Sequence, residues 1–156
     1  MSKFTVQTES ADETVKIAKQ LAKLLNGGSV ITLEGDLGVG KTTFAKGIAS
    51  GLGVKQTVSS PTFTIIKEYM GEEFPFYHID AYRLEHSDED IGVDEYFFDQ
   101  GISVVEWAQF IEHYLPKEYL QIVITYINEQ TRSLQFIPFG KSYLTIIEQL
   151  SEQLKE

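Results

Sequence analysis

Residues 35–42 read Gly-Asp-Leu-Gly-Val-Gly-Lys-Thr and fit the phosphate-binding pattern G-x-x-x-x-G-K-[ST] at every fixed position. The glycines of such a loop let the backbone turn tightly and point successive N–H groups into one concavity that holds phosphate oxygens. Lys41 then places a positive charge on the β- and γ-phosphates, and the Thr42 hydroxyl can bind Mg²⁺. The stretch therefore predicts a nucleoside triphosphate site, whose nucleotide-binding residues are Gly35, Asp36, Leu37, Gly38, Val39, Gly40, Lys41, Thr42 and Thr43.

The residues on either side of this loop support the same interpretation. Residues 29–34 are mainly β-branched and apolar, which predicts a buried strand that runs into the loop. Phe44, Ile48 and Leu52 follow at helical spacing, and a helix N-terminus at this position adds its positive end to the site. Strand, loop and helix in that order are the context that the motif requires.

The rest of the chain predicts a mixture of helices and strands. Ser10 to Glu13 has the form of a capping box, which predicts a helix over residues 11–25. Further expected elements are a hairpin of strands over 63–69 and 74–79, an acidic helix from Ser87 to about Asp99, a strand over 102–105, antiparallel strands over 119–127 and 132–139, and a helix over 141–154. Together they predict a single α/β domain over residues 1–156, a P-loop NTPase-like three-layer sandwich with a mixed, partly parallel sheet.

Composition excludes several classes of protein. The formal net charge is -10, which argues against a chain that grips nucleic acid by itself, because such binding depends on Lys and Arg. No cysteine occurs, so there is no thiolate metal site, and the three histidines lack metal-ligand spacing. Neither a signal peptide nor a membrane-spanning stretch is visible, so we expect a cytoplasmic protein that does not bind membranes.

Two acidic residues follow apolar strands and could complete the site. Asp80 ends the strand that includes Phe76 to Ile79, and Glu106 follows Ile102 to Val105. A phosphate loop needs a carboxylate at a neighbouring strand end to hold Mg²⁺ directly or through water. We expect Glu106 to be the first candidate for the metal, while Asp80 holds a metal-bound water or orients the attacking water. Alternatively, a lone acid at a strand end is a solvated terminus or a helix cap.

Four further residues are candidates for switching or lining the site. Trp107 follows Glu106 directly and is either a core aromatic or part of the site wall. Ser60 and Thr62 lie where many phosphate-loop enzymes sense the γ-phosphate, although an ordinary Ser-Pro turn also fits. Arg83 could stabilise charge on phosphate, but an ion pair with Asp80 or the acidic segment is favoured. That segment, over residues 85–99, is either a solvated helix face or a docking surface for a basic partner.

Four blocks, taken together, resemble the TsaE family. They are the loop Gly35 to Thr43, Ser60-Pro61-Thr62-Phe63-Thr64, His78-Ile79-Asp80-Ala81-Tyr82-Arg83-Leu84 and Val105-Glu106-Trp107. The family comprises small bacterial ATPases required to make threonylcarbamoyladenosine in tRNA. The resemblance covers essentially the whole chain in length and motif order, and the C-terminal third matches only in general character.

The resemblance implies an activity, cofactors and partners. It implies a weak ATPase, a hydrolase that uses ATP and Mg²⁺ and resets the TsaD and TsaB threonylcarbamoyl transferase complex, with tRNA contacted only through that complex. On this analogy Lys41 and Thr42 hold phosphate and Mg²⁺, and Glu106 completes the metal shell. Asp80 and Trp107 lie at the active site, Ser60 and Thr62 belong to a switch loop, and the segment from Thr8 to Ser10 approaches the adenine.

Three other functions share the phosphate loop. A small-molecule or nucleotide kinase typically clamps its substrates with several arginines, whereas this chain has only Arg83 and Arg132. A GTP-driven switch usually carries Asn-Lys-x-Asp, which is absent, and Asp80-Ala81-Tyr82-Arg83 stands where Asp-x-x-Gly is expected. A nucleotide-binding protein without significant turnover stays open, because the loop permits binding without fast hydrolysis.

Overall fold

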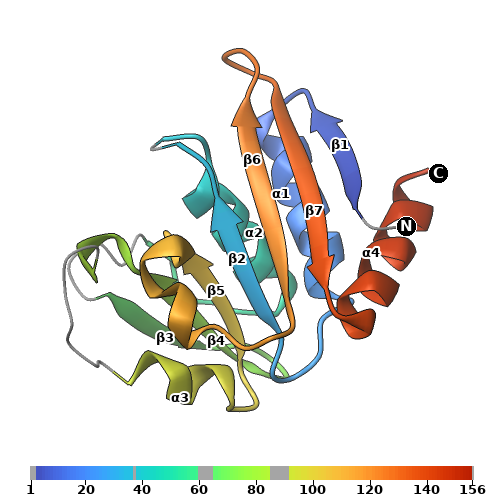
Figure 1. Ribbon diagram of the computed structural model, residues 1–156. Coiled ribbons are helices and arrows are strands. Elements are labelled where there is room, and N and C mark those ends of the chain that lie inside the picture. The colour runs from blue at the N-terminus through green and yellow to red at the C-terminus, as the bar shows by residue number, and fades with distance from the viewer. Residues whose placement is uncertain (1–2, 37, 60–64, 85–91, 156) are drawn as a thin grey trace.

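A computed structural model describes residues 3–36, 38–59, 65–84 and 92–155, and the side chain of Arg83 is not among the parts described. The described residues form one seven-stranded sheet in the order β1-β7-β6-β2-β5-β4-β3 (Figure 1). Its strands are β1 (Phe4–Thr8), β2 (Val30–Glu34), β3 (Ile66–Met70), β4 (Pro75–Asp80), β5 (Ile102–Glu106), β6 (Tyr119–Tyr126) and β7 (Arg132–Phe139). The neighbours β6, β2, β5 and β4 are parallel, whereas β3, β7 and β1 join antiparallel. The predicted mixed, partly parallel sheet is confirmed.

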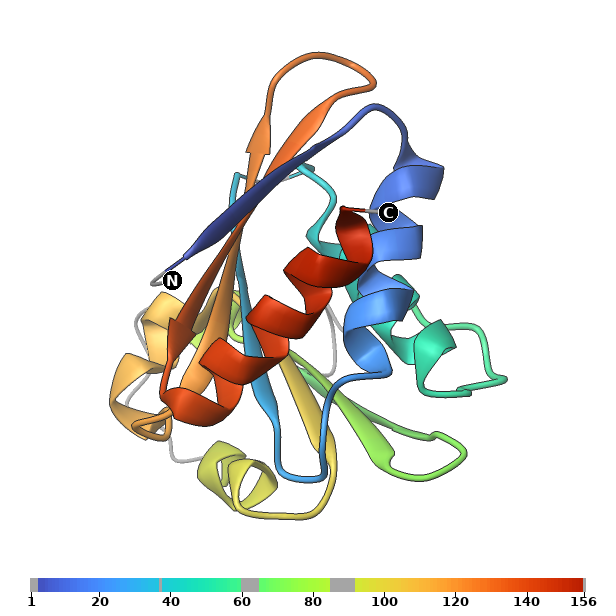
Figure 2. The same cartoon turned by 90° about the vertical axis from the view of Figure 1, so that its right-hand side faces the viewer.

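Helices cover both faces of this sheet. The α-helices are α1 (Ala11–Ala22), α2 (Lys41–Gly51), α3 (Val93–Phe97) and α4 (Lys141–Leu154), with 3-10 helices η1 (Tyr82–Leu84) and η2 (Ala108–Tyr114). One apolar cluster joins α1, α2 and α4 to one face, and a second joins η1, α3 and η2 to the other (Figure 2). The two clusters on either side of the sheet make the three layers that the sequence predicted.

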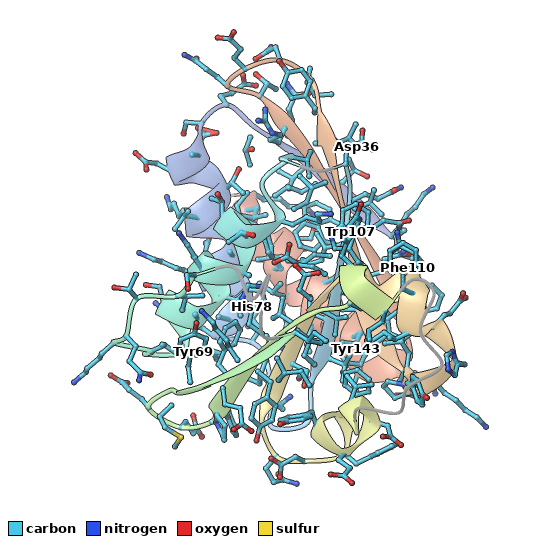
Figure 3. All side chains as sticks on the ribbon, turned by 90° about the vertical axis from the view of Figure 1, so that its left-hand side faces the viewer. Asp36, Tyr69, His78, Trp107, Phe110 and Tyr143 are labelled. Carbon is cyan, nitrogen blue, oxygen red and sulfur yellow. The ribbon has the colours of Figure 1, made fainter. Side chains whose placement is uncertain are left out.

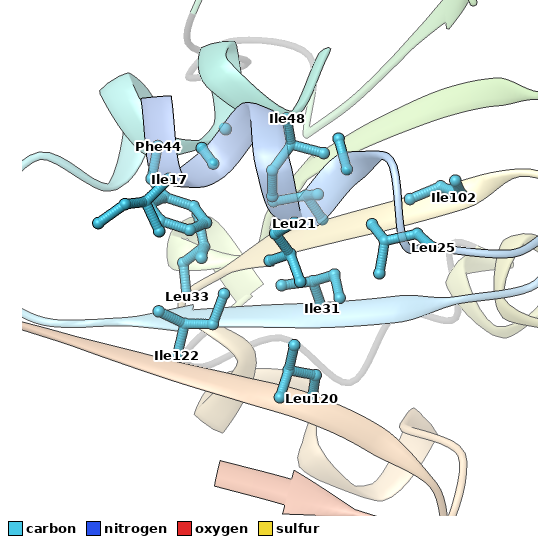
Figure 4. Close-up of a cluster of buried hydrophobic side chains, with 14 of the residues drawn as sticks. Ile17, Leu21, Leu25, Ile31, Leu33, Phe44, Ile48, Ile102, Leu120 and Ile122 are labelled. Carbon is cyan, nitrogen blue, oxygen red and sulfur yellow. The ribbon is translucent and has the colours of Figure 1, made fainter. Parts of the chain in front are cut away.

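The larger cluster fixes α1 and α2 against the central strands. Leu21 and Ile48 come from the two helices, while Ile31 and Ile122 come from β2 and β6, and all four are buried (Figure 4). The two helices approach closely at Gly47, where an added Cβ would lie only 2.6 Å from the Cβ of Ala18. Burial of these aliphatic side chains is the main term that holds the phosphate-loop helix in place.

Local sequence explains where the first helix begins. Ser10 is the N-cap of α1, and its Oγ accepts a hydrogen bond of 3.1 Å from the N–H of Glu13, as the capping pattern predicted. The helix ends at Ala22 rather than at the expected residue 25. No helix of the described part is long and apolar enough to cross a membrane.

Several elements differ from the expected ones. The sequence analysis missed β1, η1 and η2 altogether. The acidic helix expected from Ser87 to about Asp99 is reduced to α3, Val93–Phe97, within the described residues, and residues 85–91 lie outside them. Residues 63 and 64 of the expected strand over 63–69 also lie outside the described residues. The observed strand β3 begins at Ile66.

Candidate nucleotide site

The candidate site lies at the edge where the parallel strands end. The phosphate loop leaves β2 after Glu34 and enters α2 at Lys41. Asp80 and Glu106 are register partners at the carboxyl ends of β4 and β5, and Leu33 of β2 is in register with Glu106 from the other side. Parallel strands bring their carboxyl ends to one edge, where ligands of α/β sheets bind. The sheet therefore brings the loop and both predicted carboxylates together.

The loop has the backbone conformation that its glycines permit. Gly38 has φ 80° and Gly40 has φ 114°, in the left-handed region that residues with a Cβ rarely adopt. A Cβ added at either position would meet nothing within 4 Å, so the conformation, rather than lack of space, requires glycine there. The N–H of Val39 donates to Asp36 O at 3.1 Å, which closes the loop.

Lys41 is buried beneath the loop between two different partners. Its Nζ donates a hydrogen bond of 2.8 Å to Gly35 O and lies 3.5 Å from the centroid of the Trp107 ring. Burial lowers the pKa of the Lys41 ammonium group, while the carboxylates of Glu106 and Asp80 oppose this shift. A cation is thus held beside the loop by a carbonyl dipole, an aromatic face and nearby negative charges.

Glu106 is the carboxylate in contact with the loop helix. Its side chain is buried, and Oε2 accepts a hydrogen bond of 3.3 Å from Thr42 Oγ1. Oε2 also lies 2.6 Å from Nε2 of His78 on the neighbouring strand β4. A hydroxyl and a carboxylate side by side are the hard oxygen donors that Mg²⁺ prefers.

The donor set suits a magnesium ion shared with phosphate rather than a metal held by protein alone. Among the described residues, no group of three or more His, Cys, Asp or Glu side chains could hold a metal ion. Mg²⁺ in nucleotide sites is usually held by one or two carboxylates together with substrate phosphates and waters. Thr42 and Glu106 therefore fit the ion only when a nucleotide supplies the other oxygens.

Asp80 is half-buried next to these groups. Its Oδ1 accepts a hydrogen bond of 3.0 Å from the N–H of Tyr82. Burial raises the pKa of the Asp80 carboxyl and the nearby Glu106 adds to the rise, whereas the bond from Tyr82 opposes it. A carboxyl group in such surroundings can orient or accept a proton from a water molecule.

Trp107 adopts an unusual backbone conformation directly after Glu106. Its φ is 61° and ψ 41°, which is strained for a bulky residue and turns the chain from β5 into η2. The indole stacks on Phe110 with ring centroids 6.1 Å apart and meets Tyr82 edge-on at 5.0 Å (Figure 3). The indole also lies over the ammonium group of Lys41, so Trp107 contacts the loop lysine as well as its aromatic neighbours. Its role in lining the site stays a prediction.

A shallow pocket opens on the other side of the loop, towards α1. Ser10, Thr43 and Arg132 contribute to its lining. Arg132 Nε donates a hydrogen bond of 2.9 Å to Val39 O, and its guanidinium lies 4.7 Å from the centroid of the Tyr126 ring. The sequence analysis missed this role of Arg132, because 92 residues separate it from the loop position that it contacts.

Some predicted site residues have no structural description. Leu37, Ser60 and Thr62 lie outside the described residues, as does the side chain of Arg83. Their predicted roles stay predictions. Conversely, the sequence analysis excluded His78 as a zinc ligand and gave it no role of its own in the site, although its position two residues before Asp80 puts both on one strand face.

A three-layer fold with a phosphate loop between β2 and α2 and carboxylates on the adjacent strands defines a P-loop NTPase-like protein. The family model described as "Threonylcarbamoyl adenosine biosynthesis protein TsaE" matches residues 8–134, a range that includes every predicted site residue. The chain belongs to the TsaE family, as the four sequence blocks predicted.

Individual relatives agree with this assignment. The tRNA threonylcarbamoyladenosine biosynthesis protein TsaE of Bacillus subtilis (strain 168) is 50% identical over 151 residues, which cover 97% of this chain and 96% of the relative. The protein of that name from Nostoc sp. (strain PCC 7120) is 37% identical over 135 residues, or 83% and 82% of the two chains. The crystal structure of YdiB from Bacillus subtilis superimposes with a TM-score of 0.85 at 45% identity and covers 97% of this chain and 95% of that one.

Proposed function

We propose that this chain binds ATP with Mg²⁺, hydrolyses it slowly, and thereby drives or resets the complex that makes threonylcarbamoyladenosine in tRNA. The observation that carries the proposal is the cluster of Lys41, Thr42 and Glu106 around a complete phosphate loop. The names of the relatives, which are tRNA threonylcarbamoyladenosine biosynthesis proteins, point to the process that the nucleotide serves.

Each group of the site has a role in this proposal. Backbone N–H groups of the loop and the start of α2 bind the phosphates, and Lys41 neutralises the β- and γ-phosphate oxygens. Thr42 and Glu106 would hold Mg²⁺, which when bound offsets charge on those oxygens. Asp80 orients the attacking water and accepts its proton, and the indole of Trp107 keeps bulk water from Lys41.

The pocket beside α1 suits the nucleoside. Ser10 and Thr43 offer hydroxyl groups there, and Arg132 is held against the loop by its bond to Val39 O. We place the adenosine on this side of the loop. The preference for ATP over GTP rests on the absent Asn-Lys-x-Asp stretch.

Slow turnover and partner proteins belong together in this proposal. Intrinsic hydrolysis is slow in many phosphate-loop proteins until a partner completes the site. TsaD and TsaB-like proteins are the proposed partners, and tRNA is reached only through them. The chain acts as one domain over residues 1–156, with Ser60 and Thr62 as its proposed switch residues and Arg83 as a residue that lines the site.

A binding and turnover assay tests the proposal. The affinities for ATP and GTP are measured by calorimetry, and phosphate release is followed with the protein alone and with purified TsaD and TsaB. We expect tighter binding of ATP, slow release alone and faster release in the mixture. Tighter binding of GTP, or fast transfer of phosphate to a nucleotide or sugar, would contradict it.

A further inference from the structure

His78 and Glu106 form a pair in the interior, beneath the loop. His78 is on β4 and is fully buried, and its Nε2 lies 2.6 Å from Oε2 of Glu106. In Figure 3 His78 lies among the side chains between the sheet and the phosphate-loop helix. The contact is short enough for a strong hydrogen bond between an imidazole N–H and a carboxylate.

Among the described residues, only one nitrogen of this imidazole has a hydrogen-bond partner. Nδ1 of His78 is buried and finds no hydrogen-bond partner among the described residues. In a neutral imidazole that donates to Glu106, Nε2 carries the hydrogen and Nδ1 carries the lone pair. A buried polar atom without a partner is costly, so an apolar side chain would serve better if the position only filled space. The bond to Glu106 is what the imidazole adds at this position.

The strand register explains why His78 reaches Glu106 from the core side. His78 is in register with Val104, two residues before Glu106 on the same face of β5. That face packs against α1 and α2, where Phe76 and Val104 are buried. Oε2 of Glu106 thus has His78 on its inner side and Thr42 Oγ1, at 3.3 Å, on the α2 side. Two hydrogen bonds to one oxygen restrict the rotation of the carboxylate.

We propose that His78 is a positioning residue, which orients Glu106 towards the place where Mg²⁺ and the nucleotide phosphates meet. This inference rests on the metal role proposed above for Glu106. Hydrogen bonds to a ligating carboxylate fix its direction, and their loss typically lowers metal affinity by about ten- to a hundredfold. His78 acts through Glu106 and touches neither nucleotide nor metal.

The test compares two His78 variants by nucleotide binding rather than by turnover. The affinity for a non-hydrolysable ATP analogue is measured in EDTA and across a Mg²⁺ titration. Mg²⁺ should raise the affinity for the analogue, and the Mg²⁺ concentration that gives half of this rise should be about tenfold higher in His78→Leu than in the wild type. The affinity of His78→Leu for the analogue in EDTA should be unchanged. His78→Gln should recover most of the loss, since its amide nitrogen can donate to Glu106 from nearly the same place. Thermal unfolding shows that each variant is folded.

Two control variants separate the possible failures. Phe76→Leu removes packing two residues earlier on the same face of β4 and should leave the Mg²⁺ dependence unchanged. Three results would overturn the inference. Phe76→Leu could lose as much as His78→Leu, or His78→Gln could perform no better than His78→Leu. The third result is a folded His78→Leu variant whose Mg²⁺ dependence equals that of the wild type. If Glu106→Gln also keeps the wild-type Mg²⁺ dependence, the metal role of Glu106 fails, and the assignment of His78 fails with it.

Discussion

At the residue scale, the charge of Lys41 is balanced locally rather than by bulk water. Carboxylates of Glu106, Asp80, Asp36 and Glu34 all act on its ammonium group, and the indole of Trp107 covers it. This surplus of negative charge repels an anionic nucleotide. In the proposed complex the ammonium group, the backbone N–H groups of the loop and a bound Mg²⁺ would together supply the attraction for the phosphates.

Removal of this ammonium group should strongly slow the proposed hydrolysis of ATP. In Lys41→Ala the phosphates lose their only side-chain cation from the loop, so we expect phosphate release from ATP to fall at least about a hundredfold. The matched control is Lys46→Ala, an exposed lysine of the same helix α2, which should keep wild-type release. Normal hydrolysis by Lys41→Ala would remove Lys41 from the proposed catalytic residues.

Asp80 should lower the stability of the folded protein at neutral pH while it supports hydrolysis. Because the pKa of its carboxyl is raised, the folded protein keeps this proton at pH values where the unfolded chain has lost it. Between the pKa of Asp80 in the unfolded chain and its higher pKa in the folded protein, the unfolded chain binds fewer protons. The contribution of Asp80 to the free energy of unfolding therefore falls as the pH rises through this range. At neutral pH Asp80→Asn should therefore raise the Tm while phosphate release falls. A lower Tm at pH 7 with unchanged release would contradict both parts.

At the scale of the elements, the contact between α1 and α2 positions the phosphate loop. Gly47→Ala should reduce the free energy of unfolding by about 1–3 kcal/mol, because the new Cβ meets Ala18 Cβ at 2.6 Å and Val15 O at 3.1 Å. Ser50→Ala, on the exposed side of α2, should change it by less than about 0.5 kcal/mol.

Urea denaturation measures these differences, and a double variant shows their origin. Ala18→Gly removes the opposing Cβ, so Gly47→Ala should cost less in that background than in the wild type. Alanine has a higher helix propensity than glycine, so Gly47→Ala would stabilise the protein if propensity alone mattered. That result would mean that α1 and α2 pack less closely than described.

The elements that the sequence could predict are those with long or strongly apolar patterns. The β2–loop–α2 unit is confirmed because the motif and the flanking patterns agree. The five-residue β1 was missed because Phe4 and Val6 alternate over too short a stretch, and its partner β7 is far along the chain. No local pattern marks the positive φ of Trp107, the residue at which the chain turns into η2. Its indole packs against Phe110 and Tyr82, and these contacts depend on the folded structure. The sequence likewise placed Asp80 and Glu106 at strand ends, but only the sheet register brings His78 to Glu106.

At the scale of the whole molecule, the candidate site lies at the edge of the sheet that holds the carboxyl ends of the parallel strands. Of the four parallel strands, β2 runs into the loop and β6 extends beyond it, while the antiparallel strands β7, β1 and β3 extend the sheet to either side (Figure 1). From a net charge of -10 we expect partners with basic surfaces. Whether residues 88–90 dock such a partner stays a prediction, because they lie outside the described residues.

The central claim is that nucleotide chemistry at this loop serves the modification of tRNA. The most direct measurement is the threonylcarbamoyladenosine content of tRNAs that read codons beginning with A, in cells depleted of this protein and supplied with either the wild type or Lys41→Ala. We expect the content to fall on depletion, to recover with the wild type and to stay low with Lys41→Ala at equal expression. Full recovery with Lys41→Ala, or no fall on depletion, would contradict the claim.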